Sequence, residues 1–188
     1  MDLLHSPYYS SDEFVETESS EYESESDNFV MPTVNRVFTD GSYNKISKRC
    51  GYGIFFGDND IRNVGKEITE KKTNNIAELT AILKAIEIMI KSDEYKLGNI
   101  IEIYSDSEYC IKSILYWSEK WEQNGWKTAN NKPVKNKDLI QEIRKFYLSD
   151  HRIQLLHVKA HQKAPIDEEL YKLWYGNNMA DKYATGEI

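Results

Sequence analysis

Apolar and polar positions along the chain follow two different periods. Short runs of β-branched and aromatic residues, bounded by Gly, Asn and Asp, predict five strands at residues 34–39, 51–56, 61–68, 100–105 and 153–158. After the third run, apolar residues recur at steps of three and four, which predicts a helix over about residues 75–92. Shorter helices are predicted over residues 108–118, after Asn136 as a cap, and in a last segment that begins near Asn177 after a long polar loop.

The order of these elements predicts an α/β fold. Short connections join the first three strands into an antiparallel meander, and the helix over residues 75–92 provides the crossover that a parallel fourth strand requires. The expected architecture is a mixed five-stranded sheet, with three antiparallel and then two parallel strands, flanked by helices on both faces.

The net charge of −7 is concentrated in the first 33 residues. This stretch has nine acids and no Lys or Arg, so residues 34–188, with 22 acids and 24 basic residues, are slightly basic. Residues 1–33 lack helix or strand periodicity, and we interpret them as an acidic disordered tail on one domain, residues 34–188. The tail's partner is unknown: the alternatives are a solvating segment, a nucleic-acid mimic that folds onto a basic groove, or phosphorylation at Ser10, Ser20 and Ser24.

Cysteine content and hydropathy bear on the compartment. Two cysteines, Cys50 and Cys110, are too few for a disulfide framework. The sequence contains no run of 18 apolar residues, and its N-terminus has no basic segment followed by an apolar core. We therefore expect a soluble protein of a reducing intracellular compartment, with no membrane partner; cytoplasm, nucleus and a viral origin are all open.

The candidate chemistry begins with acidic residues at the ends of predicted strands. Asp40 follows an apolar strand run and precedes a Gly-Ser pair that we expect to break the strand, and Asp106 ends the run at residues 100–105 in the same way. One Asp-Gly pair is usually only a turn. However, Glu78 at the edge of the apolar stripe of the long helix and Asp181 near the C-terminus could converge with them on one point. Carboxylates fixed by a sheet are suited to hold a metal ion.

Seven motifs, in their order along the chain, resemble those of type 1 ribonuclease H, the endonuclease family that cuts the RNA strand of RNA–DNA hybrids. They are Thr39-Asp40-Gly41-Ser42, Thr73-Asn74-Asn75-Ile76-Ala77-Glu78-Leu79, Tyr104-Ser105-Asp106-Ser107, Gly125-Trp126-Lys127-Thr128-Ala129, Lys132-Pro133-Val134-Lys135-Asn136, His157-Val158-Lys159-Ala160-His161 and Gly176-Asn177 with Ala180-Asp181. The resemblance covers about residues 34–185 and implies a ribonuclease H-like fold with a basic protrusion.

The resemblance implies a two-metal phosphodiester hydrolase that leaves 5′-phosphate and 3′-hydroxyl ends. The acids that match the family's metal ligands are Asp40, Glu78, Asp106 and Asp181. Asp40 is expected to bridge two Mg²⁺ ions, with Mn²⁺ as an alternative. Without metal, at least one of these clustered carboxyls should have a raised pKa. His161 matches the family's loop histidine, which serves proton transfer or product release; its alternative is a solvated loop residue.

The same resemblance implies contacts to an RNA–DNA hybrid. Asn74 and Asn75 match positions that contact the minor groove, and Thr73 and Ser42 are candidates for phosphate contacts. Asn75 could equally be the N-cap of the long helix. We expect an RNA–DNA hybrid as the partner and the protein to be a monomer.

Residues 117–137 resemble the family's basic protrusion. Its substrate-binding candidates are Trp126, Lys127, Lys132 and Lys135, in a stretch with no acid between residues 124 and 137. The tryptophans could stack on the substrate or brace the loop. The alternative is a solvated lysine-rich loop whose tryptophans belong to the core.

Three departures from the family pattern keep a second function open. Glu108 stands where the family usually has Gln, Asn178 replaces the usual Glu, and the loop between His161 and Asp181 is long and acidic. The alternative is therefore a hybrid-binding adaptor with a weakened nuclease site, although the complete set of four acids argues against it. A fragment of a reverse transcriptase polyprotein is disfavoured, because the chain begins with Met and a tail.

Overall fold

Five strands form one mixed sheet in the computed structural model, which describes residues 32–160 and 162–188. They are β1 (Val34–Tyr43), β2 (Cys50–Phe55), β3 (Val64–Glu67), β4 (Ile100–Ser105) and β5 (Ile153–His157). Their order is β3-β2-β1-β4-β5, antiparallel from β3 to β1 and parallel from β1 to β5. The predicted α/β architecture is thus confirmed. Residues 1–31 and His161 lie outside the described residues, and the predictions about them stay predictions.

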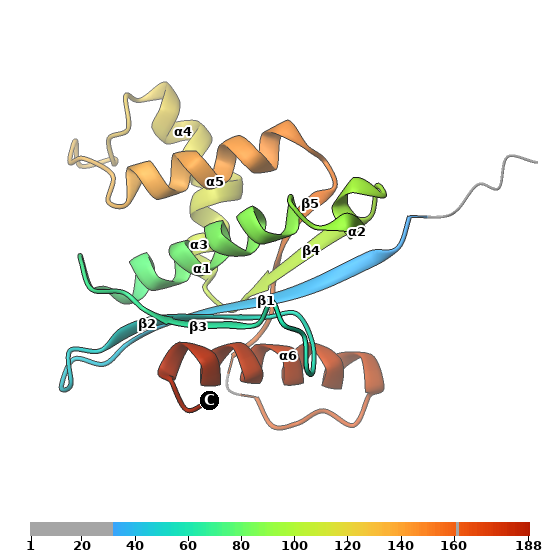
Figure 1. The fold of residues 1–188 in the computed structure, drawn as a ribbon. Helices are drawn as coiled ribbons and strands as arrows, with labels where there is room; N and C mark the ends of the chain where they lie inside the picture. Colours follow the sequence, from blue (N-terminus) through green and yellow to red (C-terminus); the bar gives the residue numbers. More distant parts are fainter. Residues whose placement is uncertain (1–31, 161) are drawn as a thin grey trace, which may run out of the picture. The chain divides into compact units, whose positions relative to one another are not determined.

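Helices cover both faces of the sheet (Figure 1). They are α1 (Asn74–Met89), α2 (Asp93–Lys96), α3 (Glu108–Lys112), the π-helical segment η1 (Ser113–Trp117), α4 (Ser118–Gln123), α5 (Lys137–Ser149) and α6 (Glu168–Thr185). On one face, α1 contacts β1, β2 and β4 and is itself covered by α5, whereas α6 contacts β1, β2 and β3 on the other face. Within residues 32–160 and 162–188, no helix combines the length and apolarity needed to cross a membrane.

Each face of the sheet has its own apolar cluster. The larger cluster includes Leu79, Ile82 and Ile86 of α1, which are at most 1% exposed. The smaller cluster lies between the sheet and α6 and consists of Phe38, Phe55, Tyr104, Val158 and Ala180. Complete burial of one Leu or Ile side chain stabilises a fold by about 1.5–3 kcal/mol. These contacts therefore hold α1 and α6 firmly against β1, the strand that carries Asp40.

Strand β1 is longer than predicted, and Asp40 lies inside it. The expectation that Gly41 and Ser42 break the strand was wrong, because the antiparallel pairing with β2 continues from Asp40 to Tyr43. The parallel pairing with β4, by contrast, ends at Thr39. Asp40 therefore has a strand neighbour on one side only, and its side chain lies where β4 stops.

Helix α6 begins much earlier than predicted. It starts at Glu168, where the side chain of Asp167 accepts a hydrogen bond from the backbone N–H of Leu170 (2.9 Å). The predicted short helix near Asn177 and the long polar loop before it were wrong. Gly176 and Asn177 have low helix propensity, but here they lie inside the helix. A Cβ atom at Gly176 would overlap the ring of Phe38, so this glycine permits close packing of α6 on the sheet.

Several other boundaries also differ from the prediction. Thr73, not Asn75, caps α1, because its hydroxyl accepts a hydrogen bond from the N–H of Ile76 (3.2 Å). The helix predicted at residues 108–118 continues through η1 and α4 to residue 123. Asn136 does precede α5, but it has a left-handed backbone (φ 58°) and its side chain makes no capping bond. The third strand is shortened to Val64–Glu67.

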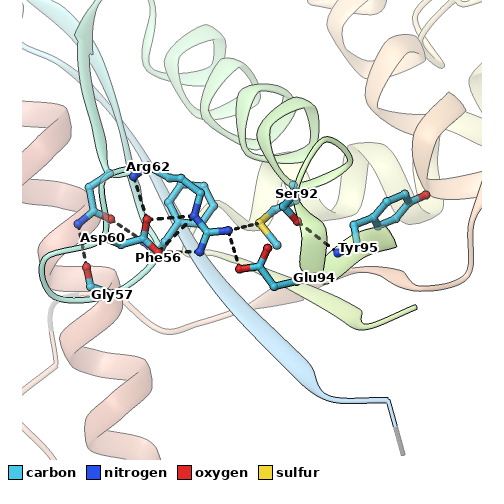
Figure 2. Close-up of polar contacts among 9 residues, drawn as sticks. Phe56, Gly57, Asp60, Arg62, Ser92, Glu94 and Tyr95 are labelled. Carbon is cyan, nitrogen blue, oxygen red and sulfur yellow. Dashed lines mark hydrogen bonds and ion pairs between the residues drawn. The ribbon is translucent and has the colours of Figure 1, made fainter. Parts of the chain in front are cut away.

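Arg62 ties the β2–β3 connection to α2 (Figure 2). Its guanidinium contacts the carboxylates of Asp60 (2.6 Å) and Glu94 (2.9 Å) and lies 4.8 Å from the ring centroid of Phe56. Ser92 caps α2 by accepting a hydrogen bond from the N–H of Tyr95 (3.2 Å). This network explains why the residues just before β3 form an ordered turn rather than more strand.

Candidate active site

Three of the four predicted acids converge on one point. Carboxylate oxygens of Asp40, Glu78 and Asp106 lie within 4.8 Å of one another. They come from β1, from α1 and from the residue that follows β4. Asp181 of α6 lines the same cavity, whose volume is about 490 Å³. The chain therefore brings acids from both faces of the sheet to a single cavity, although Asp181 is not within the 4.8 Å group.

The local fold explains this convergence. Thr39 pairs with Ser105 at the end of the parallel register. The next residues, Asp40 inside β1 and Asp106 just after β4, therefore lie at the same level of the sheet. The buried hydroxyl of Thr39 donates a hydrogen bond to the backbone oxygen of Tyr104 (3.0 Å), which fixes this pairing. Glu78 faces them from the second turn of α1, where it is only 4% exposed.

The pKa values of two carboxyls in this cavity, those of Asp40 and Glu78, are raised. Burial, followed by the charges of Asp106 and Asp181, raises the pKa of Asp40 to about 8. Burial, followed by the charges of Asp40 and Asp106, raises the pKa of Glu78 well above its ordinary value. The predicted pKa elevation in the acid cluster agrees with these shifts. A bound cation would reverse them, because it favours the ionised form of each ligand.

The donor set fits a divalent cation that prefers oxygen ligands. All four acids offer carboxylate oxygens, as Mg²⁺, Mn²⁺ and Ca²⁺ require. One oxygen of Glu78, Oε2, is buried and has no hydrogen-bond partner among the described residues. A buried, unpaired carboxylate oxygen is costly, and coordination of a cation would remove that cost.

Asn177 holds Asp106 in place and was not predicted as a site residue. Its amide nitrogen donates a hydrogen bond to Oδ2 of Asp106 (3.2 Å), and the residue is only 7% exposed inside α6. On the other side, Nε2 of His157 lies 3.2 Å from the backbone oxygen of Asp106. The sequence contained the motif with Asn177, but the incorrect start of the last helix hid its position next to Asp106.

The predicted substrate contacts divide into two groups. Ser42 and Asn74 line the acid cavity. The side-chain oxygen of Asn74 also accepts a hydrogen bond from the N–H of Tyr43 (3.1 Å), which joins the start of α1 to β1. Thr73 is exposed at the helix cap and Asn75 is half-buried in the first turn, and neither lines the cavity.

The protrusion presents its lysines to solvent but buries its tryptophan. Lys127, Lys132 and Lys135 are exposed, and a bridge between Lys127 and Pro133 closes the loop. Trp126 is only 8% exposed, belongs to the main apolar cluster and has the ammonium of Lys137 5.7 Å from its ring centroid. Of the alternatives left open for Trp126, stacking on the substrate does not fit this burial, and its ring belongs to the core and braces the protrusion.

Glu108 does not add its charge to the cavity. Its carboxylate accepts a hydrogen bond from Lys112 on the next turn (2.5 Å), and its side chain is 65% exposed. This ion pair lowers the pKa of Glu108. It is also not among the residues that line the acid cavity. The adaptor hypothesis, which assigned a weakened site partly to Glu108, is thus not supported.

Three further cavity residues were not predicted. Lys159 and Gln162 line the cavity from the segment after β5, and Trp174 lines it from the early turns of α6. Lys159 lies inside the motif that contains His161, and Gln162 directly follows it, so their place in the sequence was a usable signal. Trp174 lies in a stretch that we expected to be loop, and only the longer helix places it at the cavity.

Comparisons with known proteins agree with this arrangement. The family model described as RNase H matches residues 32–188. Ribonuclease H of Schizosaccharomyces pombe is 38% identical over 152 residues, which cover 79% of this chain and 50% of that protein. Ribonuclease H of Ruthia magnifica is 36% identical over 151 residues, which cover 79% of this chain and 91% of that protein. The chain thus spans about half the length of the first relative and most of the second.

Solved structures share the fold. The solution structure of the PFV RNase H domain has a TM-score of 0.62 and 22% identity, covering 81% of this chain and 92% of that chain. A foamy viral protease-reverse transcriptase in complex with an RNA/DNA hybrid has a TM-score of 0.61 and 20% identity, covering 96% of this chain and 22% of that chain. These two structures show the fold. The family model and the two relatives show the family: the chain belongs to the RNase H family and is a ribonuclease H enzyme.

Proposed function

We propose that this enzyme is a metal-dependent endonuclease that hydrolyses the RNA strand of RNA–DNA hybrids to 5′-phosphate and 3′-hydroxyl ends. The observation that carries the proposal is the group of Asp40, Glu78 and Asp106 within 4.8 Å. These acids, with Asp181, would hold divalent ions, and we propose Mg²⁺, with Mn²⁺ as a substitute. Bound ions of this kind stabilise charge on the attacking and leaving oxygens of a phosphodiester.

The remaining cavity residues suit the binding of a nucleic acid. Ser42 and Asn74 offer a hydroxyl and an amide at the cavity wall, and such groups can contact phosphates and 2′-hydroxyls in a wide minor groove. The foamy viral relative of similar fold was solved with an RNA/DNA hybrid, which supports the same substrate class here. His161, which lies outside the described residues, is proposed to move a proton or to assist product release.

The test is cleavage of a hybrid labelled on the RNA strand, in Mg²⁺ and in EDTA. We expect cutting of the RNA strand only with metal, and no cutting of single-stranded RNA or duplex DNA. Asp40→Asn and Glu78→Gln should abolish it. Glu142→Gln, an exposed acid on α5, is the matched control and should cut at the wild-type rate. Tight hybrid binding without cutting in Mg²⁺ or Mn²⁺ would refute the proposal.

A further inference from the structure

The acid cavity contains one cationic side chain among the described residues that line it. Beside Asp40, Glu78, Asp106 and Asp181, the lining includes Lys159. Within residues 32–160 and 162–188, Lys159 takes part in no ion pair, whereas lysines such as Lys112 and Lys172 do. Lys159 is exposed, lines the acidic cavity and forms no ion pair with its acids, so its ammonium is available for an anion.

The backbone around Lys159 is fixed on both sides. The preceding residue, Val158, donates its N–H to the backbone oxygen of Ser105 (3.1 Å) and buries its side chain in the smaller apolar cluster. Three residues after Lys159, the backbone oxygen of Gln162 accepts a hydrogen bond from Nε1 of Trp174 (2.9 Å). Lys159 therefore directly follows a residue that is hydrogen-bonded to β4.

The electrostatics of the cavity favour this position for a phosphate contact. A phosphodiester brings negative charge to a wall that already carries four carboxyls, so an ammonium there offsets repulsion as the substrate approaches. Lysine is a compact point charge on a flexible stem and suits single phosphate oxygens. The lysines of the protrusion, Lys127, Lys132 and Lys135, do not line this cavity.

We propose that Lys159 is a phosphate-binding residue that contacts a nonbridging oxygen of one defined linkage of the nucleic-acid strand lying over the acids. This inference rests on the proposed function and adds a subsite to it. Lys159 takes part in no bond-making step: it positions the strand and offsets its charge. Its contact is expected to be specific to one linkage, unlike the general attraction of a lysine that does not line the cavity.

The experiment removes the charge of one phosphate at a time along the RNA strand of a hybrid and measures the effect on binding. Each hybrid in the set has one neutral methylphosphonate linkage, and binding is measured by fluorescence anisotropy in EDTA and in Ca²⁺, beside kcat and KM in Mg²⁺. The full-length wild type is compared with Lys159→Ala, Lys159→Arg and the control Lys163→Ala. Lys163 is an exposed lysine of the same segment that does not line the cavity.

We expect Lys159→Ala to weaken binding of the unmodified hybrid about 10- to 100-fold, as for a charge-assisted hydrogen bond. At one position, a neutral linkage should lower the hybrid affinity of the wild type by a similar factor and leave the hybrid affinity of Lys159→Ala unchanged. Lys159→Arg should recover most of the affinity, and Lys163→Ala should stay within about twofold of the wild type.

Two results would overturn the proposal. Equal reductions in affinity for wild type and Lys159→Ala at every linkage would mean that no particular phosphate is bound by this lysine. Unchanged hybrid binding with a lowered Mg²⁺ requirement in Lys159→Ala would mean that the ammonium is a counter-ion for the acids instead. Absence of cleavage by the wild type would refute the proposed function alone, because the binding measurements with the methylphosphonate hybrids do not depend on cutting.

Discussion

The backbone of Gly41 lies directly against the backbone of Glu78. A Cβ atom at Gly41 would overlap the backbone nitrogen of Glu78, so any side chain there would push α1 away from β1. This close approach lets the carboxylates of Asp40 and Glu78 reach the same point from a strand and from a helix. The glycine of the Asp-Gly pair is therefore needed for close approach and not for a turn.

Gly41→Ala should damage both the fold and the site. Insertion of one methyl group into such a tightly packed position typically costs about 1–3 kcal/mol of unfolding free energy, and displacement of Glu78 should lower hybrid cleavage per folded molecule at least about 100-fold. Urea unfolding and cleavage kinetics measure the two effects. The control is Gly65→Ala, where a Cβ would meet Tyr183 of α6 instead. Gly65→Ala should be less stable than the wild type but retain its kcat. Equal kcat values for Gly41→Ala and Gly65→Ala would contradict the role of Gly41 in positioning Glu78.

The stability of the metal-free protein should fall as pH rises. Asp40 has a pKa of about 8 in the folded chain and about 4 when unfolded. Between these values the folded state holds a proton that the unfolded state has released, so the free energy of unfolding decreases with increasing pH. Asp40→Asn removes the share of this dependence that comes from Asp40 and leaves the share of Glu78, whose pKa is also raised. It should stabilise the protein by about 1–3 kcal/mol at pH 8 but hardly at pH 4.

Denaturant unfolding in EDTA at pH 4, 6 and 8 checks this dependence. Glu142→Gln on the surface of α5 should leave the pH profile of the wild type unchanged. Addition of Mg²⁺ at pH 8 should raise the stability of the wild type more than that of Asp40→Asn, because binding to the folded state alone stabilises it. If Asp40→Asn stabilises the protein no more at pH 8 than at pH 4 in EDTA, the burial and repulsion of Asp40 do not destabilise the fold.

Asn177→Ala should weaken the metal site without removing a ligand. The amide of Asn177 orients Asp106, and removal of such supporting hydrogen bonds typically lowers metal affinity about 10- to 100-fold. The expected result is a higher Mn²⁺ concentration for half-maximal cleavage, with weaker Mn²⁺ binding by calorimetry. The control on the same helix is Tyr175→Phe, which removes the hydroxyl that donates a hydrogen bond to Asp58 (2.8 Å). An unchanged Mn²⁺ affinity in Asn177→Ala would exclude the positioning role.

Local chemistry predicted part of this site, and tertiary packing determined the rest. Asp40 and Asp106 were predictable because an acid follows an apolar strand run at both places, although β1 continues past Asp40. Parallel register puts such residues side by side. Asn177 and Trp174 were not, because Gly176 indicates a helix boundary by propensity, whereas packing against Phe38 places it inside α6. For Trp126 the sequence left stacking and bracing as alternatives. Its burial in the main apolar cluster, with its ring centroid 6.4 Å from that of Trp121, favours bracing.

Substitution of the protrusion lysines should affect binding but not chemistry. Lys127, Lys132 and Lys135 are exposed and lie outside the acid cavity, so we expect their charges to attract the substrate backbone without contacting the reacting phosphate. The triple change to Ala should raise KM and leave kcat within about twofold. It should also reduce the slope of log affinity against log salt by about 1 for each phosphate that these lysines neutralise in the wild type. Lys91→Ala, at an exposed position after α1, is the control. A fall in kcat without a change in salt slope would mean that the protrusion acts on the catalytic cavity itself. The distinction between the protrusion lysines, which lie outside the cavity, and Lys159, which lines it, would then be wrong.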